Sequence, residues 1–186
     1  MRLVYKIFGR ELRYKMRRLT VLFVFILVAA CVTSINSAQT RTFTIESVEY
    51  TLELPSAAWR VVAEPDSAHQ HAEFVYGDRN DGHLRVRKEV VGANESVSKL
   101  ARRESDQKLR FLPGYVEGRE ENFAGRLNGI VVSYEFTSGG KPMLARTYYL
   151  RADNRTIYLL QFKGARDKLE KIRNQTDSIA RSFHLK

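Results

Sequence analysis

The chain has 186 residues and a formal net charge of +10, but 7 of its 31 Lys and Arg residues and only 1 of its 21 acids lie in residues 1–38, which leaves a net charge of +4 beyond them. Acids and bases are mixed along that remainder rather than gathered in a basic stripe with interleaved aromatics, which argues against nucleic-acid binding. A hydrophobic content of 44% with 11% aromatic residues excludes a disordered chain and predicts a folded domain.

An uncharged, mostly apolar run of 14 residues extends from Leu19 to Val32, between a basic start and a small, polar exit. This layout is typical of an export signal. The run is shorter than the ~20 residues that cross a bilayer, which favours a cleaved signal, while extension through Ile35 keeps a retained anchor open. A translation start at Met16 would give the signal ordinary proportions. We expect an exported protein, periplasmic or otherwise extracytoplasmic, either free or held at the membrane.

The signal has two competing ends. One is cleavage near Ala38, after small residues. The other is the sequence from Val28 to Cys31, which resembles the bacterial lipoprotein box with Val28 in place of the usual leucine, so that Cys31 would carry the lipid. Cys31 can equally be an ordinary apolar residue of the run. It is the only cysteine, so the exported part forms no internal disulfide and depends on a hydrophobic core.

Residues 39–41 are expected to be a short tether, and residues 42–186 a single α+β domain. Alternation of apolar and polar side chains predicts a strand or hairpin over 42–54 and strands over 60–62, 72–76 and 84–90. The Gly- and Asp-rich sequence 77–82 suits the turn of a hairpin.

A helix is expected to begin at Asn94 or Ser96 and to stop at Pro113-Gly114. Strands over 115–123, 126–137, 143–151 and 156–163 follow, and they predict an antiparallel meander. The chain ends in a helix over 165–183, whose apolar residues recur at spacings of 3 and 4 and predict one buried stripe: Ala165, Leu169, Ile172, Thr176, Ile179 and Phe183.

Several sequence features then occur in a familiar order: Leu54-Pro55 followed by Trp59, a mid-domain helix, Gly125-Arg126-Leu-Asn-Gly129, Arg146-Thr-Tyr148-Tyr-Leu leading to Ile157-Tyr-Leu-Leu160, and a closing Ser182-Phe183. Over residues 42–186 this order resembles the PsbP-like and DcrB-like superfamily. The resemblance implies an α/β/α sandwich with a central, mainly antiparallel sheet, one mid-domain helix and one C-terminal helix. It also implies an exported, often lipid-anchored accessory or assembly factor, in a family without common catalytic residues.

Three histidines form the only candidate metal site. His69 and His71 share one face of a strand if that segment is extended, and His83 lies across the expected hairpin from them. Imidazole suits zinc or copper, but no further ligand occurs at a recognised spacing. The competing interpretation is that these histidines are loop and edge-strand residues beside Asp66 and Glu73.

Catalytic signatures are missing from the sequence. No cysteine follows the signal, and no Gly-x-Ser-x-Gly elbow occurs. The acids Glu120 and Glu121 are adjacent, so on a strand they face opposite ways and cannot flank one bond. We therefore expect no enzymatic activity and no cofactor, and a cell-envelope accessory protein that binds a protein partner. The alternative is a module that binds a small ligand or a metal in a pocket between sheet and helix.

Overall fold

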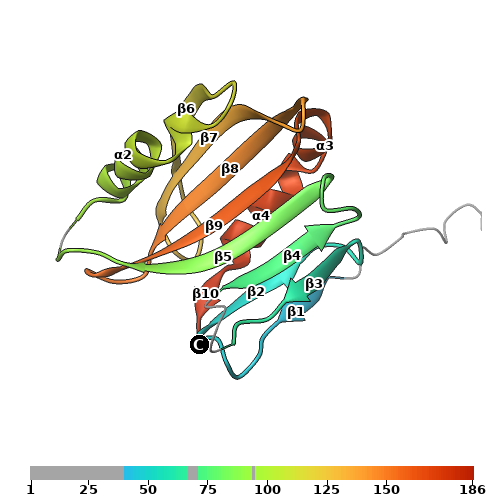
Figure 1. The fold of residues 1–186 in the computed structure, drawn as a ribbon. Helices are drawn as coiled ribbons and strands as arrows, with labels where there is room; N and C mark the ends of the chain where they lie inside the picture. Colours follow the sequence, from blue (N-terminus) through green and yellow to red (C-terminus); the bar gives the residue numbers. More distant parts are fainter. Residues whose placement is uncertain (1–39, 67–70, 94) are drawn as a thin grey trace, which may run out of the picture. The chain divides into compact units, whose positions relative to one another are not determined.

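The computed structural model describes residues 40–66, 71–93 and 95–186, which belong to one compact unit (Figure 1). The expected signal with Met16 and Cys31, the start of the tether, and His69 lie outside the described residues. Within the described ranges, no helix is long and apolar enough to cross a membrane.

A seven-stranded sheet organises the unit, and all its neighbouring strands are antiparallel. Its strands in spatial order are β3 (Trp59–Ala63), β4 (Ala72–Tyr76), β5 (Gly82–Val90), β9 (Thr156–Ala165), β8 (Lys141–Arg151), β7 (Gly129–Ser138) and β6 (Val116–Phe123). The last four confirm the expected meander. Pairing of β5 with β9, from His83 opposite Lys163 to Val90 opposite Thr156, joins the N-terminal strands to that meander.

A second, three-stranded sheet has the order β1 (Arg41–Phe43), β2 (Tyr50–Leu54) and β10 (His184–Leu185). The expected element over 42–54 is thus a hairpin. Its turn is closed by a hydrogen bond from the Val48 amide to the Ile45 carbonyl. Strand β10 was not predicted, because two residues carry no periodicity. Leu185 pairs with Tyr50, so the end of the chain is fixed to its first hairpin.

Helix α2 (Val97–Gln107) covers part of one face of the seven-stranded sheet (Figure 1). Ser96 is its N-cap, and Ser96 Oγ accepts a hydrogen bond from the Lys99 amide at 3.1 Å. The helix packs Leu100 and Ala101 on apolar residues of β7, β8 and β9, which are Ile130, Tyr149, Ile157 and Leu159. A short 3₁₀ turn, η1 (Leu109–Phe111), ends the segment before Pro113.

The opposite face of the sheet is covered by two C-terminal helices and by the small sheet, and it holds the larger core. Trp59, which is fully buried there, donates from Nε1 to Gln175 Oε1 at 3.0 Å. Helices therefore lie on both faces of a mainly antiparallel sheet. This confirms the α+β class and the sandwich architecture.

The single helix expected over 165–183 is two helices, α3 (Arg166–Lys171) and α4 (Arg173–Ser182). Ile172 separates them with φ −102° and ψ 14°. Its Cδ1 would lie only 2.9 Å from a Cβ placed on Gly82, so Ile172 packs tightly against a glycine of β5. This packing outweighs the helical continuity that the spacing suggests. Five members of the predicted stripe are buried: Leu169, Ile172, Thr176, Ile179 and Phe183.

Candidate functional site

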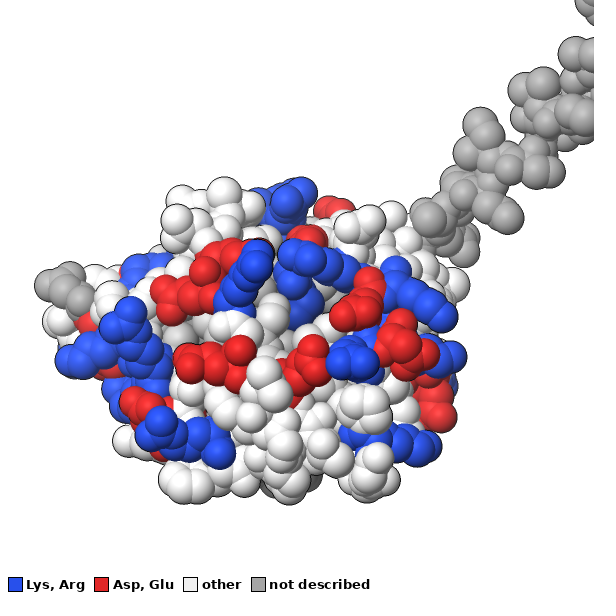
Figure 2. All heavy atoms as spheres, turned by 90° about the horizontal axis from the view of Figure 1, so that it is seen from above, with Lys and Arg blue, Asp and Glu red and all other residues white. Residues whose placement is uncertain are grey.

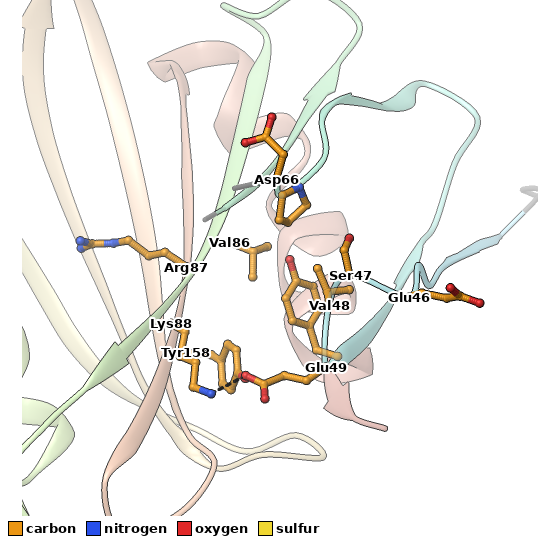
Figure 3. A pocket seen from close by; sticks show the side chains of 11 residues that line it. Glu46, Ser47, Val48, Glu49, Asp66, Val86, Arg87, Lys88 and Tyr158 are labelled. Carbon is orange, nitrogen blue, oxygen red and sulfur yellow. Dashed lines mark hydrogen bonds and ion pairs between the residues drawn. The ribbon is translucent and has the colours of Figure 1, made fainter. Parts of the chain in front are cut away.

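A pocket of about 600 Å³ lies between the small sheet and the seven-stranded sheet (Figure 3). This volume falls in the range of roughly 300–1,000 Å³ that is typical of small-molecule sites. The lining comes from the loop before β2 and the first residue of β2, from the segment after β3, and from strands β5 and β9: Glu46, Ser47, Val48, Glu49, Tyr50, Pro65, Asp66, Val86, Arg87, Lys88 and Tyr158. No helix contributes to this lining, whereas we had expected a pocket between sheet and helix.

One end of the pocket is polar. Lys88 Nζ donates to Glu49 Oε1 at 2.6 Å, and the hydroxyl of Tyr158 donates to the same oxygen. These two hydrogen bonds, with that from Lys88 the stronger influence, lower the pKa of Glu49. Burial and the neighbouring Glu49 carboxylate raise the pKa of Tyr158. Figure 3 shows this group at one end of the pocket and Asp66 at the other, while Arg87 points away.

Tyr50 gives the pocket a buried hydroxyl. Its side chain is 6% exposed, and its Oη has no hydrogen-bond partner among the described residues. Burial raises the pKa of this phenol, so it stays protonated. The Tyr50 ring meets the Tyr158 ring edge-on, with 5.8 Å between centroids. An unpaired buried hydroxyl costs about 1–3 kcal/mol, and a ligand acceptor could relieve that cost.

Two of the predicted metal-site histidines meet at a carboxylate. His71 Nε2 lies 3.0 Å from Glu73 Oε1, and His83 Nε2 lies 2.9 Å from Glu73 Oε2. Arg85 donates to Glu73 Oε1 from Nε at 2.9 Å and from Nη2 at 2.7 Å, and Arg79 Nη2 donates to Oε2 at 3.2 Å. We call these five residues the Glu73 cluster. It lies on the sheet face that α2 partly covers.

The Glu73 cluster is an ion-pair network in the described part of the chain. Burial raises the pKa of Glu73, but hydrogen bonds from His83 and Arg85 outweigh it and bring the pKa to about 2. Burial lowers the pKa of His83, against the opposing effect of Glu73. Across residues 40–66, 71–93 and 95–186 no three His, Cys, Asp or Glu side chains form a metal-binding group. Metal binding that involves His69 stays a prediction.

Sequence reasoning missed Glu73 as the centre of this cluster and Glu49, Lys88 and Tyr50 as pocket residues. The signal for Glu73 was present, because it alternates with the buried Ala72 and Phe74 and so shares a face with His71. The pocket had no such signal. It brings together segments that are about a hundred residues apart in the chain.

The two acids on β6 lie as expected. Glu120 Oε1 accepts a hydrogen bond from Ser98 Oγ of α2 at 2.6 Å, whereas Glu121 Oε2 lies 3.6 Å from Arg173 Nη2 of α4. They therefore face opposite sides of the sheet. Gly139 and Gly140 form the β7–β8 hairpin turn, and their φ angles of 56° and 73° lie in the left-handed region that glycine adopts without strain.

No protein-family model and no curated protein sequence matches this chain. Several solved structures, however, are similar to this chain in fold. Cyanobacterial PsbP (CyanoP) from Synechocystis sp. PCC 6803 has a TM-score of 0.55 at 14% identity, over 82% of this chain and 96% of its own. LpqN of Mycobacterium tuberculosis, described as involved in cell envelope biogenesis, has a TM-score of 0.52 at 16% identity, over 81% and 94%.

A variant of the protein Mog1 has a TM-score of 0.54 at 10% identity, over 79% of this chain and 96% of its own. At such identities the likeness concerns the fold alone. The three alignments cover nearly the whole of the neighbouring structures, so they confirm at the level of the fold the resemblance drawn from the sequence. The chain has a PsbP-like fold.

Proposed function

We propose that this chain is an exported, non-enzymatic accessory protein of the cell envelope that binds a protein partner. The observation that carries the proposal is the PsbP-like fold, shared over most of the chain with CyanoP and with LpqN. The sequence of residues 1–38, with its basic start and apolar run, supports export. Fold alone does not assign function, so the proposal needs direct tests.

The surface charge suits a protein partner better than a nucleic acid. On the face drawn in Figure 2, Lys and Arg side chains are interleaved with Asp and Glu, so that face carries no patch of a single sign. Sequence-independent binding to nucleic acid depends on clustered positive charge. Apolar side chains are exposed where η1 leads into β6, with Phe111 at 75% and Val116 at 59% exposure. Aromatic side chains such as Phe111 are enriched in protein interfaces, so this position is the one chosen for the test of partner binding.

Export is tested by the intact mass and N-terminus of the protein recovered from its host. A lipid-modified N-terminus at Cys31, a free N-terminus near Ala38, or an uncleaved chain facing outward would each support export. A full-length chain recovered entirely from the cytoplasm would contradict it. The same measurement decides between the alternatives left open by the signal sequence.

Partner binding is tested by photo-cross-linking in intact cells. A photoreactive residue replaces Phe111, and a matched control replaces Arg155, an exposed residue in the turn between β8 and β9 at the opposite end of the sheet. A defined adduct from position 111 that position 155 does not give is the expected result. No adduct, or equal labelling from both positions, would contradict a partner surface at η1 and β6.

A small-ligand function is the second candidate, and the pocket that contains Tyr50 favours it. Ligands of the right size with one hydrogen-bond acceptor should raise the melting temperature of the chain, because they bind only the folded state. Silence across a broad panel of such compounds and of divalent metals would count against this function.

A further inference from the structure

The sheet face that carries α2 is polar where the helix does not cover it. Period-2 alternation places Arg85 and Arg87 of β5 on this face, opposite Gln161 and Leu159 of β9. Lys163 of β9 follows on the same face, beside His83 on one side and Ala145 on the other. Residues on neighbouring strands lie about 5 Å apart, and diagonal neighbours about 7–8 Å apart. Arg85 is therefore a diagonal neighbour of Lys163.

Lys163 is half-buried, and its amine has no hydrogen bond or ion pair with any described residue. The acids nearby are already paired. Glu73 accepts hydrogen bonds from both of its arginines, and Glu104 accepts from Arg87 and from the Tyr149 hydroxyl. Burial and the charges of Arg85 and Arg87 lower the pKa of Lys163. The Glu104 carboxylate partly offsets this lowering through its charge but forms no ion pair with Lys163. The face thus holds a positive charge without a direct ion-pair partner in the described part of the chain.

Other groups on this face have unused hydrogen-bonding capacity. The Tyr134 hydroxyl, two strands from Lys163 in the same cross-strand row, accepts from Gln161 Nε2 at 3.1 Å and donates to no described residue. Ala145 lies between them in this row and, like Tyr134, is fully buried. Arg85 uses Nε and Nη2 for Glu73, so its Nη1 is left for a further acceptor. The buried Thr147 hydroxyl also has no described partner.

We propose that this face binds an anionic group, a carboxylate or a phosphate carried by a small molecule. Lys163 supplies the counter-charge, and the Tyr134 hydroxyl and Arg85 Nη1 supply hydrogen bonds. The Glu73 cluster holds the Arg85 guanidinium in place before the anion arrives, which lowers the entropic cost of binding. This site lies on the opposite face of the sheet from the pocket that contains Tyr50.

The test uses the full-length chain in a neutral detergent, because its N-terminal segment is apolar. Inorganic phosphate and succinate are titrated against it by calorimetry and by thermal unfolding, with sodium chloride at matched ionic strength as the reference. Lys163→Met is compared with Lys141→Met, which removes the same charge from an exposed position at the start of β8. Tyr134→Phe is a second variant that removes one donor and keeps the charge.

We expect at least one anion to raise the melting temperature beyond chloride in the wild type and in Lys141→Met. In Lys163→Met the affinity should fall at least tenfold, and in Tyr134→Phe at least threefold. Preference for phosphate over succinate, or the reverse, identifies the anion class. No rise with either anion, or a rise that survives Lys163→Met, would overturn the proposal. If Lys163→Met does not fold, full retention of affinity in Tyr134→Phe would overturn the proposed geometry.

Discussion

Replacement of Glu73 by Gln should destabilise the folded unit at neutral pH. The carboxylate accepts hydrogen bonds from Arg79 and Arg85 and contacts His71 and His83, and its pKa falls to about 2 from an ordinary 4.5. At about 1.36 kcal/mol for each pKa unit, this shift corresponds to at most about 3 kcal/mol. Arg79 and Arg85 are 66% and 41% exposed, so water screens their pairs with Glu73. We therefore expect Glu73→Gln to cost about 2 kcal/mol.

The sign of the pH dependence follows from the lowered pKa of Glu73. The carboxylate's contribution is complete above its unfolded-state pKa of 4.5 and is lost as the pH falls towards about 2. His83 adds an opposite trend, because Glu73 partly offsets the lowering of its pKa by burial. Without Glu73 the variant resists protonation of His83 more strongly. The difference in the free energy of unfolding between the wild type and Glu73→Gln should thus widen slightly below pH 6.5, where His83 begins to protonate in the unfolded chain. It should shrink below about pH 4.5, where Glu73 itself begins to protonate.

The assay is urea unfolding at pH values from 7 to 3, followed by the fluorescence of Trp59, the single tryptophan. Glu117→Gln is the control, because Glu117 is an exposed carboxylate on the edge strand β6, and its loss should change stability by less than about 0.5 kcal/mol. A cost for Glu73→Gln no larger than that of the control at pH 7 would refute the reasoning. So would a cost that stays constant down to pH 3.

Two further predictions concern packing and buried polarity. Tyr50→Phe removes a hydroxyl that has no described partner, so the free energy of unfolding in urea should stay unchanged or rise by up to about 1 kcal/mol. Tyr158→Phe loses the hydrogen bond to Glu49, so it should lower that free energy by about 1 kcal/mol. Equal losses in both would refute the assignment. Gly129→Ala would place a Cβ 1.9 Å from the Tyr149 carbonyl oxygen, so it should lower the free energy of unfolding by about 1–3 kcal/mol. In the control Gly92→Ala the new Cβ has no atom nearer than 3.8 Å, so the loss should be under about 0.5 kcal/mol.

Most of the fold could be predicted from the sequence because its elements have local signals. The strands that form the meander alternate clearly, and the C-terminal stripe at spacings of 3 and 4 predicted which side chains of α3 and α4 are buried. Trp59 and the order of elements around it carried the resemblance to PsbP-like proteins. These features depend on residues that are close in the chain.

The structural features that the sequence did not predict depend on contacts between residues far apart in the chain. The break at Ile172 comes from packing against Gly82, which lies ninety residues earlier, and β10 exists because β2 offers it an edge. Glu104 interrupts the apolar face of α2 in the sequence, yet it is buried because Arg87 and Tyr149 bind it. The pocket combines residues 46–50 with 86–88 and Tyr158. No single window of the sequence contains these pairs.

The polar face around Glu73 is more than a solvated sheet surface. Ordering each arginine side chain forfeits about 2 kcal/mol of conformational entropy, and exposed ion pairs seldom offset that loss. If this sheet face served only to keep the protein soluble, unpaired Thr, Ser or Lys side chains would be sufficient. Glu73 and Glu104 on this face instead accept hydrogen bonds from arginines, and Lys163 is left without a direct ion-pair partner among the described residues. Glu73→Gln and Lys163→Met should therefore differ in their effect on the melting temperature. Loss of Glu73 breaks a paired network, whereas loss of the Lys163 charge removes an unpaired one and should not lower the melting temperature. If both variants destabilised the chain equally, Lys163 would belong to the ion-pair network and would not be available to bind an anion.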